Sequence, residues 1–216
     1  MLGEFFIIKA KVRNSIKGIF KSSDLVLDVG CGENPYYHKA IKAKIICADI
    51  KPTKKTHLIG DAMQLPVKRE KFDGIISINS LYYYSSTSRA LKEFSNALKK
   101  NGKLVLMMPF MYPIHDAPDD KYRFTEYGII ELLKNDFEIK NIKAIGGIFN
   151  LPAVFLHSLM KGAPLMAPKQ LKPIMRFLSI IVFYIPYLLA QLFSILDFLD
   201  MTGRWPTYYF VVAVRK

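Results

Sequence analysis

Cysteine is scarce in this chain of 216 residues. Only Cys31 and Cys47 occur, and both lie in apolar, strand-like stretches. Two such cysteines exclude a disulfide framework, and their spacing is not that of a zinc site. We therefore expect a cytoplasmic protein without a metal centre.

Acidic residues are also few, with 18 Asp and Glu against 31 Lys and Arg, which gives a net charge of +13. Such a surface can attract nucleic acid, anionic lipid or acidic substrates, although scattered lysines also occur on ordinary solvated surfaces. We expect no signal peptide, because the apolar run at 5–8 is too short and no small-residue cleavage site follows it. No internal repeat is present, and 51% hydrophobic residues suffice for one globular domain over 1–216.

Apolar strand-like runs alternate with helical patterns along the chain. The predicted strands are 25–30, 44–50, 56–61, 72–79, 103–109, 137–147 and 207–216. Between two of them, at 87–102, apolar residues recur every three or four positions, and Gly102 stands where a helix C-cap is expected. This alternation predicts an α/β fold, and the near-continuous apolar strands favour a mostly parallel sheet that is covered on both faces.

The first predicted strand ends in a glycine-rich turn, in the segment LVLDVGCGENPYY at 25–37. In doubly wound sheets such a turn lets the backbone approach a ligand closely. A dinucleotide-binding loop would have a third glycine at position 35, where this chain has Pro35. A pyrophosphate-binding loop is therefore poorly supported.

The pattern D-x-G-x-G formed by Asp28, Gly30 and Gly32 resembles the first motif of the class I S-adenosylmethionine-dependent methyltransferases. The resemblance extends through about the first 150 residues in order and spacing. It implies a Rossmann-like fold with a mostly parallel seven-stranded sheet, an antiparallel last strand and, in this chain, a helical insertion before that strand. Asn34 replaces the family's usual third glycine, and asparagine tolerates left-handed backbone better than most residues do.

The resemblance also implies S-adenosylmethionine as the cofactor. In the family, an acid that ends the second strand accepts hydrogen bonds from the ribose hydroxyls, and Asp49 stands there. An acid after the third strand meets the adenine amine, and Asp61 stands there. Asn79 ends the fourth strand, where the methionine part and the acceptor meet. The complete set of expected cofactor-binding residues is Asp28, Gly30, Cys31, Gly32, Asp49, Ile50, Asp61, Ala62, Met63 and Asn79.

The irregular segment after the fifth predicted strand carries the candidates for acceptor chemistry. Methyl transfer to a hydroxyl requires a positioned nucleophile and a base that removes its proton. His115 is the preferred catalytic base, because imidazole titrates near neutrality, and Asp116 is the second candidate. The alternative is that His115 and Arg123 only hold the loop together, with Arg123 pairing with Asp119 or Asp120.

Three consecutive tyrosines, Tyr82, Tyr83 and Tyr84, follow the fourth strand. They either line the acceptor pocket or pack in the core beneath the next helix. The segment reads NSLYYY at 79–84, without the Asp/Asn-Pro-Pro-aromatic motif of amino-adenine methylation. The chain also lacks a Pro-Cys nucleophile for cytosine methylation, so nucleic acid is not the expected partner.

A hydrophobic insertion at 148–206 separates the last two predicted strands, and residues 177–196 within it carry no charge. As a helix, this stretch is about 30 Å long, which matches the core of a bilayer. A single span would leave the strand at 207–216 on the wrong side of the membrane. We therefore expect helices that lie in a membrane interface, or that cover a pocket for a greasy acceptor.

The N-terminal segment 3–21 has an amphipathic helical pattern. Phe5, Ile8, Val12, Ile16 and Ile19 share one face, with basic residues beside it, as in interfacial helices. Packing over the site as a lid is the alternative. The predicted organisation is an N-terminal helix at 1–22, a cofactor-binding core at 23–147, the insertion at 148–206 and a last strand at 207–216.

Together the resemblance and these patterns predict a cytoplasmic methyltransferase that methylates an oxygen of a small, lipid-linked or isoprenoid-type acceptor, with peripheral membrane contact through 3–21 and 177–196. A nucleic-acid methyltransferase and a non-catalytic membrane-associated scaffold with the same fold are the alternatives. Intact Asp49 and Asp61 argue against the scaffold, and a measurement of cofactor binding would discriminate.

Overall fold

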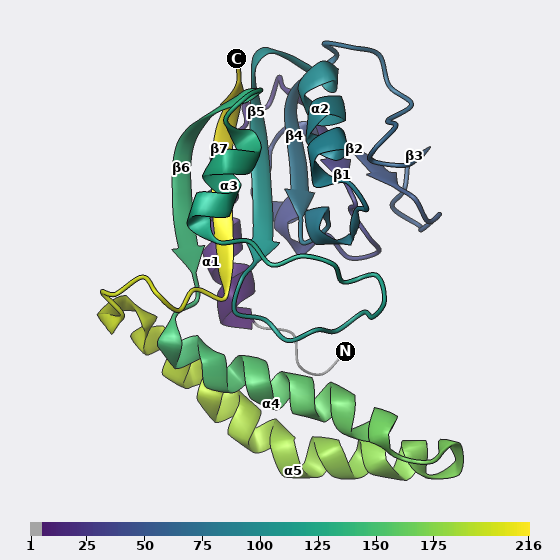
Figure 1. Ribbon diagram of the computed structural model, residues 1–216, viewed down its shortest axis with the longest axis vertical. Helices are drawn as coiled ribbons and strands as arrows, with labels where there is room; N and C mark the ends of the chain where they lie inside the picture. The colour runs from purple at the N-terminus through teal and green to yellow at the C-terminus, as the bar shows by residue number, and fades with distance from the viewer. Residues whose placement is uncertain (1–5) are drawn as a thin grey trace.

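A seven-stranded sheet forms the centre of the protein in the computed structural model, which describes residues 6–216 (Figure 1). The strands lie in the order β3-β2-β1-β4-β5-β7-β6. Strands β1 to β5 are parallel, and β7 pairs antiparallel with both β5 and β6. The predicted fold class is therefore confirmed, including the antiparallel last strand. The strands are β1 (Leu25–Val29), β2 (Lys44–Asp49), β3 (Leu58–Ile59), β4 (Phe72–Ile78), β5 (Leu98–Pro109), β6 (Phe137–Ile145) and β7 (Tyr208–Arg215).

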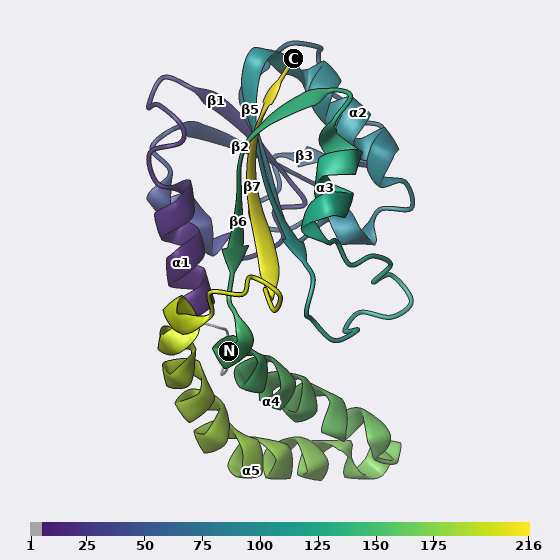
Figure 2. The same cartoon turned by 60° about the vertical axis from the view of Figure 1, so that its left-hand side comes forward.

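Helices cover both faces of this sheet (Figure 2). Apolar residues of α2 and α3 form one core with one face, and residues of α1 form a second core with the other face. The central strands β1, β4, β5 and β7 are largely buried on both sides, which explains their near-continuous apolar sequences. The helices are α1 (Phe6–Ile16), α2 (Thr87–Ala97), α3 (Glu126–Leu133), α4 (Leu151–Gly162) and α5 (Lys172–Phe193).

Helix α2 is shorter than the sequence predicts. It ends at Ala97, and Leu98 already pairs with Phe72 in the sheet. The predicted C-cap at Gly102 is wrong, because Gly102 lies within β5. Burying Leu98 in the core favours an extended backbone over the local helical preference, and Asn101, with φ 62°, takes the left-handed conformation instead.

Strand β3 is also shorter than the predicted 56–61. It keeps only Leu58 and Ile59 at the edge of the sheet, where it pairs with β2 alone. The chain then turns into an isolated bridge between Asp61 and Gln64. The turn leaves Asp61 just beyond the carboxyl end of the strand.

Helix α1 packs against the protein's own sheet. Ile8, Val12 and Ile16 are all buried in the second core, so this apolar face is not free for lipid. Phe5 of the predicted amphipathic face lies outside the described residues. Over the described residues, the hydrophobic pattern of the N-terminal segment therefore reflects packing of α1 in the core.

Helices α4 and α5 form a helical hairpin that projects beyond one end of the sheet (Figures 1 and 2). The chain leaves the sheet after β6, runs out along α4, returns along α5 and re-enters as β7. The helical region Lys169–Leu199 is long and apolar enough to cross a membrane, and only 22% of its most apolar window is buried. Its outward face exposes large aliphatic and aromatic side chains, including Phe177, Ile181, Ile185 and Leu189.

Candidate active site

The strand order reverses between β1 and β4, and ligands of such sheets bind at the carboxyl ends of the strands beside this point. Gly30 and Gly32 follow β1 there with φ values of 75° and 60°, which L side chains rarely adopt. A Cβ on Gly30 would lie 2.4 Å from Cβ of Ser80, so the loop packs tightly on one side. A Cβ on Gly32 would meet no atom within 4 Å, so the other side of the loop is open to a ligand.

Asp28 lies beneath this loop, and its side chain is fully buried. Its carboxylate accepts hydrogen bonds from the Tyr37 hydroxyl, at 2.8 and 3.0 Å, and its Oδ2 lies 2.6 Å from Nε2 of His38. Burial raises the pKa of Asp28, and the contacts with His38 oppose that effect. The sequence places Asp28 among the cofactor-binding residues, whereas the structure buries its side chain against Tyr37 and His38.

Asp28 and His38 also lie beside Cys47, and one potential ligand atom of each lies within 4.8 Å of the others. Burial raises the pKa of the Cys47 thiol, which disfavours the thiolate that a metal ion requires. Because Tyr37 and His38 already satisfy the Asp28 carboxylate, the group acts as a hydrogen-bonded cluster beneath the loop.

Two further acids stand at the carboxyl edge with part of their surface exposed. Asp49 accepts from the backbone N–H of Gly32 at 2.9 Å and from that of Lys51 at 3.0 Å. Asp61 accepts from the N–H of Met63 at 2.8 Å. A carboxylate has about four acceptor positions, so both keep lone pairs for hydroxyl or amine donors of a ligand.

The other predicted cofactor residues surround these acids. Ile50 is 66% exposed beside Asp49, where an apolar ring could pack on it. Cys31 and Ala62 are buried, so they can offer a ligand mainly their backbone groups. Met63 is half-buried and accepts a hydrogen bond from Ser85 through its sulfur.

Asn79 ends β4 with a φ of 54° and donates its backbone N–H to Met107. Its Oδ1 is buried and has no hydrogen-bond partner within residues 6–216. An orphaned buried acceptor is costly and calls for a donor from a ligand. Asn79 lines a cavity of about 100 Å³ together with Tyr82, Pro109, Tyr112, His115 and Tyr208.

His115 lies at the centre of a hydrogen-bonded cluster on the wall of this cavity. Its Nδ1 is 3.0 Å from Oδ2 of Asp120, and its Nε2 is 3.0 Å from the Tyr82 hydroxyl and 3.2 Å from the Tyr83 hydroxyl. Arg123 holds the Asp120 carboxylate in a bidentate pair, at 2.5 and 2.7 Å. The hydrogen bonds from Arg123 lower the pKa of Asp120, which keeps this buried carboxylate ionised.

This arrangement orients the imidazole. Nδ1 of His115 faces two acceptors, the Pro113 carbonyl at 3.4 Å and the Asp120 carboxylate at 3.0 Å, which assigns the imidazole proton to Nδ1 and leaves the lone pair of Nε2 toward the cavity. Asp116 instead has a side chain that is 63% exposed, lies 3.6 Å from Nε2 and accepts from Tyr83. The residue that supports His115 is thus Asp120, which the sequence offered only as a loop-stabilising partner of Arg123.

The three tyrosines after β4 take different places. Tyr82 is buried against His115, and Tyr83 joins it from the half-exposed side. Tyr84 donates to Ser80 and packs beside the glycine loop, and burial raises its pKa to about 12. The cavity also includes Tyr112 and Tyr208, which the sequence did not single out. Tyr208 has no local signal, because it reaches the cavity from β7.

Residues 27–106 match the family model of a methyltransferase domain. Over this segment the chain is similar to a methyltransferase domain, and S-adenosylmethionine-dependent methyltransferases share its fold. A relative with 29% identity over 109 residues is an uncharacterized protein of Methanocaldococcus jannaschii. That match covers 47% of this chain and 43% of the relative, so the chain spans less than half of its length.

Solved structures of methyltransferases share the fold. Coclaurine N-methyltransferase bound to N-methylheliamine and SAH aligns with a TM-score of 0.58 and 13% identity, over 97% of this chain and 70% of that one. A SAM-dependent methyltransferase of Aquifex aeolicus aligns with a TM-score of 0.52 and 17% identity, over 65% of this chain and 85% of that one. The [4+2]-cyclase SpnF aligns with a TM-score of 0.58 and 18% identity, over 96% of this chain and 80% of that one. The same fold therefore also supports other chemistry.

The cofactor that this similarity implies is S-adenosylmethionine. The site fits it on three counts: open space over Gly32, acceptor carboxylates on Asp49 and Asp61, and an unpaired acceptor on Asn79. Asp49 and Asp61 would hold the adenosine hydroxyls and amine, and Asn79 would face the amino acid part. When bound, the cofactor supplies an electrophilic methyl group on a sulfonium.

Proposed function

We propose that the protein methylates a hydroxyl group of a lipid-linked or isoprenoid-type acceptor at a membrane surface. The observation that carries the proposal is the position of the apolar helical hairpin beside the His115 cavity.

The His115 cluster suits the removal of a proton from an acceptor hydroxyl. Nε2 of His115 faces the cavity with its lone pair, and the fixed Asp120 carboxylate stabilises the imidazolium that forms. The Tyr82 hydroxyl lies 3.0 Å from the same nitrogen and marks the place that a substrate hydroxyl would take, while the Tyr83 hydroxyl donates to Asp116. Burial raises the pKa of Tyr82, so this phenol stays neutral and acts as a donor.

The hairpin shares its core with the walls of the cavity. Tyr187 and Ala190 of α5 belong to the same buried cluster as Tyr208, and Tyr112 packs against that cluster. The opposite face of α5 exposes Ile185, Leu189 and their neighbours. An exposed apolar surface of this extent marks a partner or a membrane, so an acceptor held there lies next to the catalytic cluster.

Interfacial binding agrees better with the topology than a membrane span does. Helix α5 is apolar on both faces, but Tyr187 and Gln191 are buried in the protein. After Phe193 the chain returns within 15 residues to Tyr208, which starts the strand between β5 and β6. A helix fixed at this distance from the sheet can lie in a membrane surface without crossing it.

The proposal is tested with labelled S-adenosylmethionine and a membrane lipid extract. We expect label to enter the organic phase, and we expect the His115→Ala variant to lower turnover by about 10²–10⁴-fold while it binds the cofactor product normally. Label that enters nucleic acid, or a wild type that binds the cofactor and methylates no lipid fraction, would contradict the proposed acceptor.

A further inference from the structure

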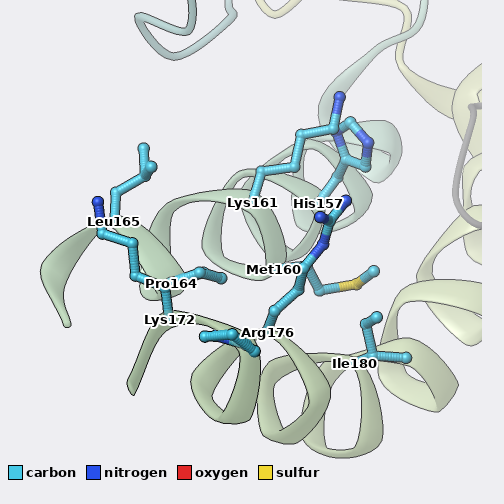
Figure 3. A pocket seen from close by; sticks show the side chains of 9 residues that line it. His157, Met160, Lys161, Pro164, Leu165, Lys172, Arg176 and Ile180 are labelled. Atoms are coloured by element: carbon cyan, nitrogen blue, oxygen red, sulfur yellow. The ribbon is translucent and has the colours of Figure 1, made fainter. Parts of the chain in front are cut away.

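A second hollow, of about 680 Å³, lies within the helical hairpin (Figure 3). Its walls come from α4, α5 and the turn between them, and it does not share a lining residue with the His115 cavity. Cationic side chains reach it from both helices, Lys161 from α4 and Lys172 and Arg176 from α5. We call it the hairpin hollow.

The cations of the hairpin hollow have no acidic partners in the part of the chain that the structure describes. Within residues 6–216, Lys161, Lys172 and Arg176 form no ion pair, whereas cations elsewhere, such as Lys99 and Arg123, do. The sequence contains no Asp or Glu at 139–196, so no acid of the hairpin itself can reach them. Three like charges around one hollow repel one another, and an anionic ligand would offset that repulsion.

The remaining lining of the hairpin hollow is apolar. Met160 and Leu165 contribute from the α4 side, and Ile180 contributes from α5. Phe177, one residue after Arg176, begins the exposed apolar face of α5. His157 also lines the hollow, and burial together with Lys161 lowers its pKa to about 4, so at neutral pH it adds no charge.

This combination selects one class of ligand. A free phosphate would leave the apolar walls unused, and a neutral lipid would leave three cations without a counterion. A nucleic acid requires a cationic surface along its backbone, whereas these cations are bordered by Phe177 and Leu165. We propose that the hairpin hollow binds the phosphate head of a membrane lipid, whose hydrocarbon chains lie along the exposed face of α5.

The proposal rests on the membrane location proposed above but not on methyl transfer. The lipid bound here is either the acceptor or an anchor, and binding alone is measured. A protein that binds lipid phosphate without methylating any lipid would support the hollow and contradict the proposed reaction. A protein that methylates a lipid but binds lipids without selectivity for phosphate would support the proposed reaction and contradict the role of the hollow.

The test compares two charge reversals in one turn of the hairpin. Lys172→Glu changes a lining residue of the hollow, and Lys169→Glu changes an exposed lysine three positions earlier that does not line it. The probes are phosphatidylcholine vesicles with and without phosphatidic acid. We expect Lys172→Glu to weaken binding to the phosphatidic acid vesicles by at least about 10-fold and Lys169→Glu by about threefold or less. Equal effects would show diffuse attraction and overturn the proposal.

Soluble probes separate a lipid from a free phosphate. We expect short-chain phosphatidic acid below its micelle concentration to bind at least about 10-fold more tightly than inorganic phosphate, and Arg176→Glu to abolish the difference. Equal affinity for both probes would overturn the lipid assignment. Calorimetric binding of the cofactor product checks that each variant is folded, and Arg176→Gln replaces any variant that fails this check.

Discussion

The Oδ2 atom of Asp120 lies 3.0 Å from Nδ1 of His115, and it also accepts from the backbone N–H of His115 at 3.1 Å. One buried carboxylate thereby fixes both the position of the loop and the orientation of the imidazole. Arg123 holds the same carboxylate from the other side. The chain from Arg123 to His115 is built from a segment of nine residues, so a single substitution can test it.

Asp120→Asn should lower turnover by roughly 10–100-fold, because the neutral amide no longer stabilises the imidazolium or fixes the ring. The affinity for the cofactor product should stay within about twofold of the wild type. Asp119→Asn, at the exposed neighbouring acid, is the control and should retain full turnover. Asp120→Glu should recover part of the activity. A fall in cofactor affinity equal to the fall in turnover would indicate a general loss of structure instead.

Asp49→Ala should weaken binding of the cofactor product by about 1.5–3 kcal/mol, because the carboxylate can accept charge-assisted bonds from the ribose. The loss includes its hydrogen bond with the N–H of Gly32, which shapes the loop. Titration calorimetry measures the effect. Glu138→Ala, an exposed acid on β6, is the matched control. Unchanged binding by the Asp49 variant would remove this residue from the cofactor site.

His157 should make the stability of the protein depend on pH. Burial lowers its pKa from 6.5 to about 4, so between these values the unfolded chain binds the proton and the folded protein does not. Stability contributed by the neutral imidazole is therefore complete above pH 6.5 and falls as the pH decreases toward 4. Between pH 7 and pH 5 the free energy of unfolding should fall by about 2 kcal/mol from this group alone.

Denaturant titrations of the wild type and the His157→Gln variant at several pH values measure this contribution. The variant should show a shallower slope between pH 7 and pH 5. Parallel slopes in wild type and His157→Gln would show that His157 does not bury a neutral ring.

Ile185→Glu with Leu189→Glu should lower the affinity for anionic vesicles by at least about 10-fold, because both side chains lie on the exposed apolar face of α5. Their exposure predicts a thermal midpoint close to that of the wild type. Ile59→Glu on β3 is similarly exposed but lies away from the hairpin, and it should bind vesicles normally (Figure 1). Equal losses in both variants would locate the membrane contact elsewhere.

The parts of the fold that depend on short segments could be predicted from the sequence. Buried parallel strands read as continuous apolar runs, and the glycines after β1 follow from the left-handed turn there. The end of α2 could not be predicted, because Leu98 becomes extended only through its pairing with Phe72, 26 positions away. Local propensity does not include such a partner.

Some residues of the candidate site could likewise be predicted from the sequence, and others could not. Asp49 and Asp61 could be predicted because the family that the chain resembles has an acid at or just after the end of each of these strands. Asp120 could not be separated from Asp116 and Asp119 by sequence, since all three lie within five residues. Only the three-dimensional position of Arg123 and His115 distinguishes them. Tyr208 reaches the cavity from beyond the insertion, which no spacing rule would connect to β4.

The place of β7 between β5 and β6 has a consequence for how the chain acquires its structure. β6 pairs with β7 alone, and β5 has one edge that only β7 covers. Until Tyr208–Arg215 leave the ribosome, one strand has no neighbour and another has an open edge, while the apolar hairpin has already been synthesised. Open strand edges and exposed apolar helices are the surfaces on which nascent chains aggregate. Early contact of the hairpin with a membrane or a chaperone would protect the chain during that interval, so translation beside a membrane would favour correct closure of the sheet.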